Sequence, residues 1–156
     1  MNGHIIAYDL GTGGIKASLF NLEGCEQASA FLQYDIHYTG ALQHEQRPND
    51  WWNGVIQTTR ELLDKTQAPP EGIVALALSG QSLAVVPVDE TGALLREYVP
   101  IWSDARAEAQ AGAFFSKVDP DEWYMSTGNG FPPAQYSLFK IMWYRDNEPA
   151  LYQKTY

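Results

Sequence analysis

The stretch of residues 7–20, AYDLGTGGIKASLF, decides the fold. An apolar run ends at Asp9, a glycine-rich turn follows, and the chain resumes with alternating apolar and polar residues. This alternation is typical of strands, so we predict a β-hairpin with strands over residues 5–9 and 15–20. Glycine lacks a Cβ, so such a turn lets a ligand approach successive backbone N–H groups, which form a nest for anions such as phosphate. The glycines of the turn are Gly11, Gly13 and Gly14.

Asp9 stands beside this predicted phosphate nest. An aspartate there would repel a phosphate unless a divalent cation lay between them, and Mg²⁺ is usually held by one or two carboxylates plus substrate phosphates. We therefore expect Asp9 to orient Mg²⁺. A plain hairpin turn, with Asp9 bonded to nearby backbone groups, is the alternative, and Lys16 could equally be a solvated strand lysine. The residues expected to line the phosphates are Gly11, Thr12, Gly13, Gly14 and Lys16.

Two familiar glycine motifs are excluded. The Walker A pattern requires a Gly-Lys-Ser/Thr ending that opens a helix, whereas here Ile15 precedes Lys16 and a strand follows. The dinucleotide-binding pattern requires a third glycine where Lys16 stands, again at the start of a helix. The hairpin therefore belongs to neither class.

Composition limits the class of protein. The chain has 156 residues, of which 45% are hydrophobic and 19% charged, as expected for one globular domain. Its net charge of −9 argues against a nucleic-acid partner, because nucleic-acid binding depends on a basic surface. The longest apolar runs, such as residues 73–78, are too short to span a bilayer, and the single Cys25 fits a reducing compartment. We expect a cytoplasmic protein without a membrane partner.

The remaining pattern predicts the order of the elements. A third strand is expected over residues 27–34, then a polar loop over residues 45–50. A helix with one apolar face follows, from an N-cap at Asn49 to about residue 66. The unbroken apolar run of residues 73–78 predicts a central strand covered on both faces. This order favours a mixed sheet with an antiparallel start over a doubly wound one.

The C-terminal part is expected to be mainly helical. Helices are predicted over residues 105–115 and around residues 138–145, where Leu138 and Ile141 recur at helical spacing. A last helix opens near Pro149, and the sequence appears cut after it.

The hairpin pattern Asp-x-Gly-Thr-x-x-x-Lys resembles the first phosphate motif of the actin, hexokinase and Hsp70 superfamily. More specifically, the chain looks like the N-terminal part of an FGGY-family carbohydrate kinase. This resemblance implies an α/β, ribonuclease-H-like (actin-like ATPase) domain with a mixed five-stranded-type sheet and flanking helices. It also implies that residues 1–156 are an incomplete N-terminal domain and that the C-terminal nucleotide-binding domain is absent. The stretches that carry it are AYDLGTGGIKASLFN, DWWNGV, ALSGQSLAVVPVD, PIWSDARA and GNGFPPAQYSLFKIMWYRDNEP.

The resemblance also implies a sugar pocket. Asp104 matches an acid that bonds sugar hydroxyls in the family, although it could instead cap the helix of residues 105–115. Trp102 could present an aromatic face to the sugar or pack in the core. Ser82 and Leu83 occupy positions that set substrate choice, where xylulokinases typically have Met-His and glycerol kinases Arg-Glu, so the sugar stays open. The implied substrate-binding residues are Gln81, Ser82, Leu83, Trp102, Asp104 and Gln135.

The activity implied by the resemblance is ATP-dependent phosphorylation of a sugar or polyol, with ATP and Mg²⁺ as cofactors and a homodimer as a possible assembly. A xylulokinase-like enzyme is the first choice, and ribulose, gluconate, glycerol or another polyol are alternative substrates. The catalytic base is expected beyond Tyr156, so this chain alone is expected to be inactive. A non-catalytic sugar-binding module and an actin-like protein are alternatives of other classes.

Overall fold

The structure is a computed structural model that describes residues 3–130 and 132–156. The chain forms two compact units. Unit 1 consists of Met1–Ile36 and Arg47–Gln81, and unit 2 consists of His37–Gln46 and Ser82–Tyr156. The hairpin therefore belongs to unit 1, whereas most of the residues expected to bind sugar belong to unit 2.

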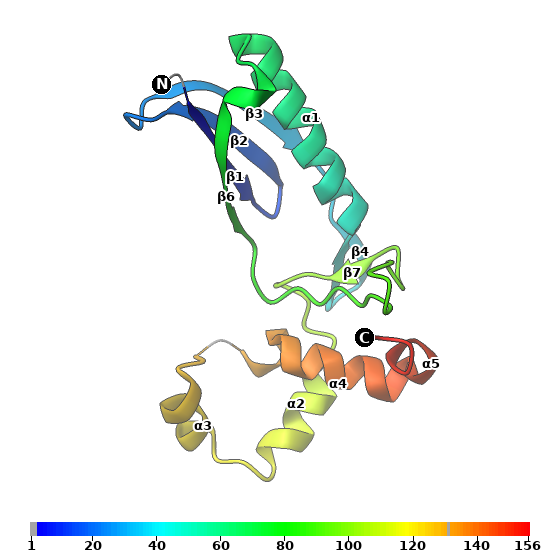
Figure 1. Cartoon of the computed structure of the whole chain (residues 1–156). Helices are drawn as coiled ribbons and strands as arrows, with labels where there is room; N and C mark the ends of the chain where they lie inside the picture. The colour runs from blue at the N-terminus through cyan, green and yellow to red at the C-terminus, as the bar shows by residue number, and fades with distance from the viewer. Residues whose placement is uncertain (1–2, 131) are drawn as a thin grey trace. The chain divides into compact units, whose positions relative to one another are not determined.

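Unit 1 is built on a four-stranded mixed sheet in the order β3-β2-β1-β6 (Figure 1). β1 runs antiparallel to β2 and parallel to β6, and β2 runs antiparallel to β3. The mixed sheet with an antiparallel start is thus confirmed, and the described residues supply four strands of it. The strands are β1 (His4–Leu10), β2 (Gly14–Asn21), β3 (Glu26–Gln33) and β6 (Ile73–Gly80).

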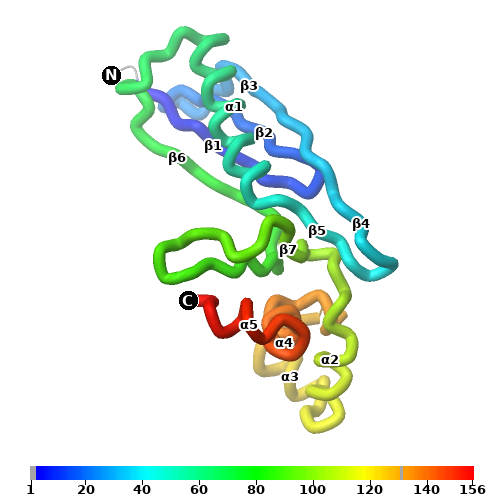
Figure 2. Tube along the Cα trace, turned by 90° about the vertical axis from the view of Figure 1, so that its right-hand side faces the viewer, coloured from blue at the N-terminus to red at the C-terminus, as the bar shows by residue number. Residues whose placement is uncertain are grey.

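Helix α1 (Pro48–Thr66) packs on β2 and β3, along one face of this sheet (Figure 2). It begins with Pro48 and has Arg47 at the N-cap position, so the predicted cap at Asn49 is wrong. Proline suits a first helical position because its fixed φ is already helical and it has no N–H to leave unpaired there. A short 3₁₀ helix, Pro70–Gly72, precedes β6. The buried core of the unit is Ile6, Tyr8, Ile15, Ala17, Leu19, Ala30, Tyr34, Leu62 and Ala68.

The contact between α1 and β2 depends on a glycine. A Cβ added to Gly54 would lie 2.6 Å from Cγ2 of Ile15, which is too close for two carbon atoms. We expect Gly54→Ala to lower the free energy of unfolding by about 1–3 kcal/mol, the usual effect of overpacking a core. Urea denaturation followed by circular dichroism measures it.

Gly112 provides the matched control in another helix, α2 (Glu108–Phe115). Apart from the adjoining residues and the backbone of α2 itself, no heavy atom of the described residues lies within 4 Å of a Cβ added there. Gly112→Ala should therefore stabilise the protein by about 0.5–1 kcal/mol, because alanine loses less backbone entropy in a helix. Equal effects of the two substitutions would show that the close approach at Gly54 is not tight.

Strand β6 differs from its prediction. It is an edge strand of the described sheet, and its apolar side chains are exposed: Val74 by 61%, Leu76 by 68% and Leu78 by 70%. The apolar run shows that both faces of the strand suit a buried environment, but it cannot show which element covers them. In the part of unit 1 that the structure describes, α1 lies over β2 and β3 and leaves β6 uncovered.

Unit 2 contains a small antiparallel sheet in the order β4-β5-β7. Residues 45–46, predicted to open a polar loop, are the end of β5, so that part of the prediction is wrong. The strands of this sheet are β4 (His37–Gly40), β5 (Gln43–Gln46) and β7 (Val99–Pro100). Besides α2, the helices of the unit are α3 (Pro120–Thr127), η2 (Pro133–Gln135), α4 (Ser137–Asn147) and α5 (Pro149–Tyr152).

Helix α4 confirms the predicted helix but buries an unexpected face. Leu138 and Ile141 are each 41% exposed, whereas Phe139, Lys140 and Tyr144 are buried. Phe139 joins the second apolar cluster of the protein. The buried members of that cluster are Ala107, Ala111, Tyr136 and Phe139, with Leu83, Phe114, Phe115, Met142 and Trp143 packed around them.

Candidate phosphate and sugar sites

The β1–β2 hairpin places an acid and a base opposite each other. The strand register pairs Asp9 with Lys16 on one side and with Ser79 of β6 on the other. Directly paired residues of neighbouring strands share one face of the sheet, and the side chains of Asp9 and Lys16 are both exposed. This face therefore presents both charges to solvent at the end of the strands where the turn lies. The pocket on it is lined by Ala7, Tyr8, Asp9, Lys16, Ser18, Phe20, Glu26 and Ser79.

Two hydrogen bonds fix the start of the glycine turn. The Tyr34 hydroxyl donates to the carbonyl oxygen of Gly11 at 2.5 Å, and the N–H of Gln81 donates to the carbonyl oxygen of Leu10 at 2.9 Å. Burial, with a smaller contribution from the charge of Asp9, raises the pKa of Tyr34 to about 12. The hydroxyl therefore keeps its proton at neutral pH and stays a donor to the turn.

The glycines of the turn serve different purposes. A Cβ on Gly14 would lie 2.5 Å from the carbonyl oxygen of Leu32, so this buried position excludes larger residues. A Cβ on Gly13 would meet no described neighbour within 4 Å, and Gly13 is exposed. Gly11 and Thr12 are half-buried. The turn therefore has open space at Gly13, where an anion could approach the backbone.

The expected sugar residues lie in different environments. Gln81 is half-buried directly after β6 in unit 1, and exposed Ser82 opens the next segment of unit 2. Leu83 is half-buried and packs against the second apolar cluster, with a φ of 61°. Trp102 is 36% exposed and could offer a ring face to a ligand. Gln135 is half-buried at the end of η2.

Asp104 is completely buried, and both of its carboxylate oxygens accept hydrogen bonds. Oδ1 accepts from the N–H of Arg106 at 3.0 Å and from its Nε at 2.9 Å. Oδ2 accepts from the N–H of His44 at 2.8 Å and from Nη2 of Arg106 at 2.8 Å. Helix α2 begins at Glu108 with Ala107 as its N-cap, so the alternative that Asp104 caps this helix is wrong. Its contact with a sugar stays a prediction.

Arg106 connects Asp104 to a larger group of charges. Its Nη2 lies 2.7 Å from Oε1 of Glu45, a residue of β5 that is also buried. Arg96 contacts the same Glu45 oxygen at 3.3 Å and Glu148 at 3.1 Å. The guanidinium of Arg106 also lies over the ring of Trp143, 5.0 Å from its centroid. Sequence reasoning missed this network because its members are scattered along the chain; only the acid and arginine of WSDAR are close in sequence.

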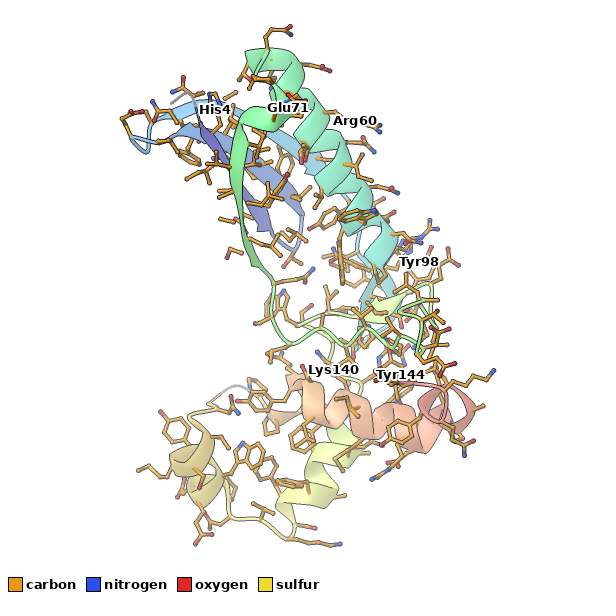
Figure 3. All side chains as sticks on the ribbon, viewed as in Figure 1. His4, Arg60, Glu71, Tyr98, Lys140 and Tyr144 are labelled. Carbon is orange, nitrogen blue, oxygen red and sulfur yellow. The ribbon has the colours of Figure 1, made fainter. Side chains whose placement is uncertain are left out.

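Sequence reasoning also missed Lys140. Its side chain is buried, and Nζ donates to three backbone carbonyl oxygens: those of Ile101 at 2.6 Å, Leu83 at 3.1 Å and Trp102 at 3.5 Å. Burial lowers the pKa of Lys140 to about 8, an effect that the charge of Asp104 opposes and that of Arg106 reinforces. Figure 3 labels Lys140 with Tyr144, one turn further along α4.

The lowered pKa of Lys140 predicts a pH dependence of stability. Between about pH 8 and the ordinary lysine pKa of 10.5, the unfolded chain keeps a proton that the folded protein has released. The free energy of unfolding therefore rises with pH across this window, by at most about 1.4 kcal/mol per pH unit. Lys140→Met should remove this rise. Urea denaturation of both proteins from pH 7 to 10.5 measures the difference, and a constant difference would contradict the prediction.

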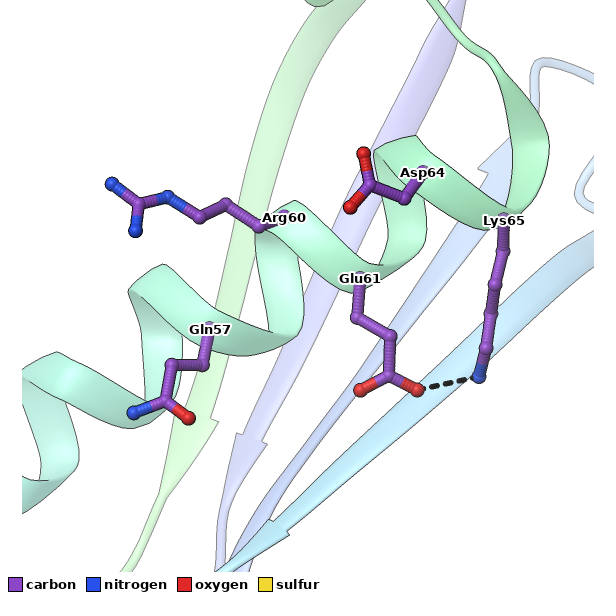
Figure 4. Close-up of a pocket in the computed structure, with 5 residues that line it drawn as sticks. All are labelled: Gln57, Arg60, Glu61, Asp64 and Lys65. Atoms are coloured by element: carbon purple, nitrogen blue, oxygen red, sulfur yellow. Dashed lines mark ion pairs between the residues drawn. The ribbon is translucent and has the colours of Figure 1, made fainter.

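Another hollow lies on the exposed face of α1 (Figure 4). Five side chains of this one helix line it, and Glu61 and Lys65 form an exposed ion pair across it at 2.6 Å. Exposed pairs of this kind contribute little to stability. None of the expected site residues lies there, so the hollow carries no functional argument. Its lining residues are Gln57, Arg60, Glu61, Asp64 and Lys65.

Within residues 3–130 and 132–156, no group of three or more His, Cys, Asp or Glu side chains is arranged to hold a metal ion. No helix in this part of the chain combines the length and apolar character needed to cross a bilayer.

Comparison with known proteins identifies the family. Residues 4–156 match the FGGY family of carbohydrate kinases, N-terminal domain. The chain belongs to this family. It is 29% identical to the xylulose kinase of Bacillus subtilis over 97% of this chain and 30% of that protein. It is 26% identical to the glycerol kinase of Nitrobacter hamburgensis over 94% of this chain and 29% of that protein.

The solved structures of FGGY kinases agree with the fold. The crystal structure of xylulose kinase from Rhodospirillum rubrum matches with a TM-score of 0.85 and 27% identity, over 97% of this chain and 31% of that chain. The α/β, actin-like fold expected from the sequence is therefore confirmed. This FGGY chain spans about 30% of the length of the curated relatives it matches.

Proposed function

We propose that the protein carrying this chain is an ATP-dependent kinase that transfers the γ-phosphate of ATP to a hydroxyl of a sugar or polyol, with xylulose as the first substrate to test. Membership of the FGGY family supports the class of reaction. The observation that carries the proposal is the hairpin, where exposed Asp9 faces Lys16 beside an open glycine turn. Xylulose is preferred because xylulose kinase is the most common name among these relatives, although glycerol and gluconate kinases are also found by both sequence and structure.

The residues of the hairpin suit Mg²⁺ and ATP. Phosphoryl transfer depends mainly on positioning and on stabilisation of charge on the phosphates. Bound Mg²⁺ would neutralise part of that charge. Asp9 would hold the ion, and Lys16 would add a positive charge on the same face of the sheet. The open backbone at Gly13 would donate N–H groups to phosphate oxygens.

The proposed sugar residues differ in how they could act. Trp102 and Ser82 expose side chains that could contact the sugar directly. Leu83 has its side chain in an apolar cluster, so its proposed contribution is the path of its backbone. For Asp104 to bind a sugar hydroxyl, that hydroxyl would have to replace a hydrogen bond from Arg106 or His44. Gln81 and Gln135 complete the proposed set with amide groups.

The catalytic base and the adenosine pocket are proposed to lie outside residues 1–156. We expect the purified 156-residue chain to show no sugar-dependent ADP formation, because residues of this chain supply only part of the site. A coupled ADP assay with Mg-ATP measures it, with a mock purification as the control. Activity clearly above that control would contradict this assignment of the base.

The proposed function is tested with the full-length protein. Xylulose, ribulose, gluconate and glycerol are each supplied with Mg-ATP, and ADP formation is compared with an ATP-only reaction. We expect at least one substrate to raise the rate, and xylulose to have the highest kcat/KM. Another preferred substrate would correct the choice of sugar, whereas tight sugar binding without ADP formation would favour a binding module and overturn the kinase proposal.

A further inference from the structure

Lys140 joins two segments that are far apart in sequence. Its Nζ donates to the carbonyl oxygen of Leu83 on one segment and to those of Ile101 and Trp102 on the other. All of these residues belong to unit 2. Leu83 and Trp102 are also two of the residues expected at the sugar pocket. A single side chain of α4 therefore connects both parts of the proposed pocket.

A fully buried lysine is unusual at a position such as 140. Lysine is seldom fully buried unless it is paired with a carboxylate, because removing the charge from water is unfavourable. Asp104 is close enough to affect the pKa of Lys140, but its oxygens bind Arg106 and His44. Nζ instead donates to backbone carbonyl oxygens. Its three donors suit a task that an apolar residue could not perform, which is to hold backbone groups from separate segments.

The backbone conformation of Leu83 independently indicates that this segment is held in place by its surroundings. Its φ of 61° lies in the left-handed region, which is unfavourable for a residue with a branched side chain. Such conformations persist where the surroundings hold them, and they gather at functional sites. At Leu83 the surroundings are the apolar cluster around its side chain and the ammonium group of Lys140 at its carbonyl oxygen.

We propose that Lys140 is a positioning residue that holds the segments around Leu83 and Trp102 in the backbone geometry that binds the sugar. This proposal rests on the proposed kinase function for its sugar-binding part. Lys140 acts through the carbonyl groups and does not itself touch the substrate. Loss of its donors should loosen both segments together, although they are separated by about twenty residues of sequence.

The first experiment needs no substrate. Amide hydrogen exchange is measured in the full-length protein for wild type, Lys140→Met and the control Tyr144→Phe, which changes another buried residue of α4. We expect exchange in residues 82–85 and 101–105 to become about tenfold faster or more in Lys140→Met, the effect of losing hydrogen bonds from a charged group. Tyr144→Phe should leave both segments within twofold of wild type. Unchanged exchange in Lys140→Met overturns the proposal.

The second experiment measures the sugar. In Lys140→Met, KM for the best sugar should rise about tenfold or more, while KM for ATP stays within twofold. A purely structural role would lower kcat through loss of folded protein and leave both KM values unchanged. Lys140→Arg, which keeps charged donors, should recover part of the sugar affinity. An unchanged sugar KM overturns the sugar-binding part.

The outcomes separate the two proposals. If the wild-type protein uses no sugar at all, the proposed function fails and the sugar-binding part of this proposal fails with it. The exchange measurement then still decides whether Lys140 holds the two segments. If Lys140→Met does not fold, Lys140→Gln, which keeps N–H donors on a shorter side chain, is compared with Tyr144→Phe in the same way.

Discussion

Replacing Asp9 by asparagine should lower kcat of the full-length protein by on the order of 10²-fold or more, as expected when one charge-stabilising group is lost from a transition state. Asparagine keeps the shape of the side chain and removes the negative charge that would hold Mg²⁺. The substitution changes none of the residues proposed to bind the sugar, so the sugar Kd should change little. Steady-state kinetics and calorimetric sugar binding measure the two effects.

Asp64→Asn is the matched control for this substitution. Asp64 is an exposed carboxylate of α1 in the same unit, and none of the expected site residues shares its surface hollow. Its kcat should stay within about twofold of wild type, because screened surface charges at a distance contribute little. If Asp9→Asn also stays within threefold, Asp9 is a turn residue and the metal assignment is wrong.

Replacing Arg106 by leucine should lower the free energy of unfolding by about 3–5 kcal/mol. The substitution leaves Asp104 and Glu45 buried without their main cationic partner. Urea denaturation at neutral pH measures the loss. Adding Asp104→Asn to Arg106→Leu should restore part of the stability, since the variant then buries one charge fewer.

An exposed pair of the same residue types is the control for Arg106. Arg145 and Asp146 are in contact at 2.8 Å, with side chains 52% and 39% exposed. Arg145→Leu should change the free energy of unfolding by less than about 1 kcal/mol, because water already solvates both groups. A loss at Arg106 no larger than that at Arg145 would show that the buried network contributes nothing beyond a surface pair.

The hairpin could be predicted from sequence because everything that specifies it is local. Alternation over residues 15–20 fixes the strand, and glycines fix the turn between β1 and β2. The position of Asp9 opposite Lys16 then follows from the register. The order of the predicted strands and helices then indicated a mixed sheet with an antiparallel start, and the resemblance to FGGY kinases implied the same class of fold.

The interior of unit 2 could not be predicted in the same way. Lys140 looks like a surface residue of an amphipathic helix, and its acceptors are backbone groups that carry no sequence signal. Glu45 pairs with Arg106 across sixty-one positions of the chain, and nothing in the sequence around either residue indicates so distant a partner. The burial of Phe139 rather than Leu138 is decided by packing against α2, which apolar spacing alone leaves ambiguous.

The edge position of β6 affects how this chain behaves when it is produced by itself. One edge of the strand bonds to β1, and the other belongs to no strand pair in the described sheet. An open edge with apolar side chains such as Leu76 and Leu78 beside it is a template for adding strands from other molecules. The isolated 156-residue chain should therefore self-associate as its concentration rises, and a charged residue at Leu76 or Leu78 is the natural way to keep it monomeric.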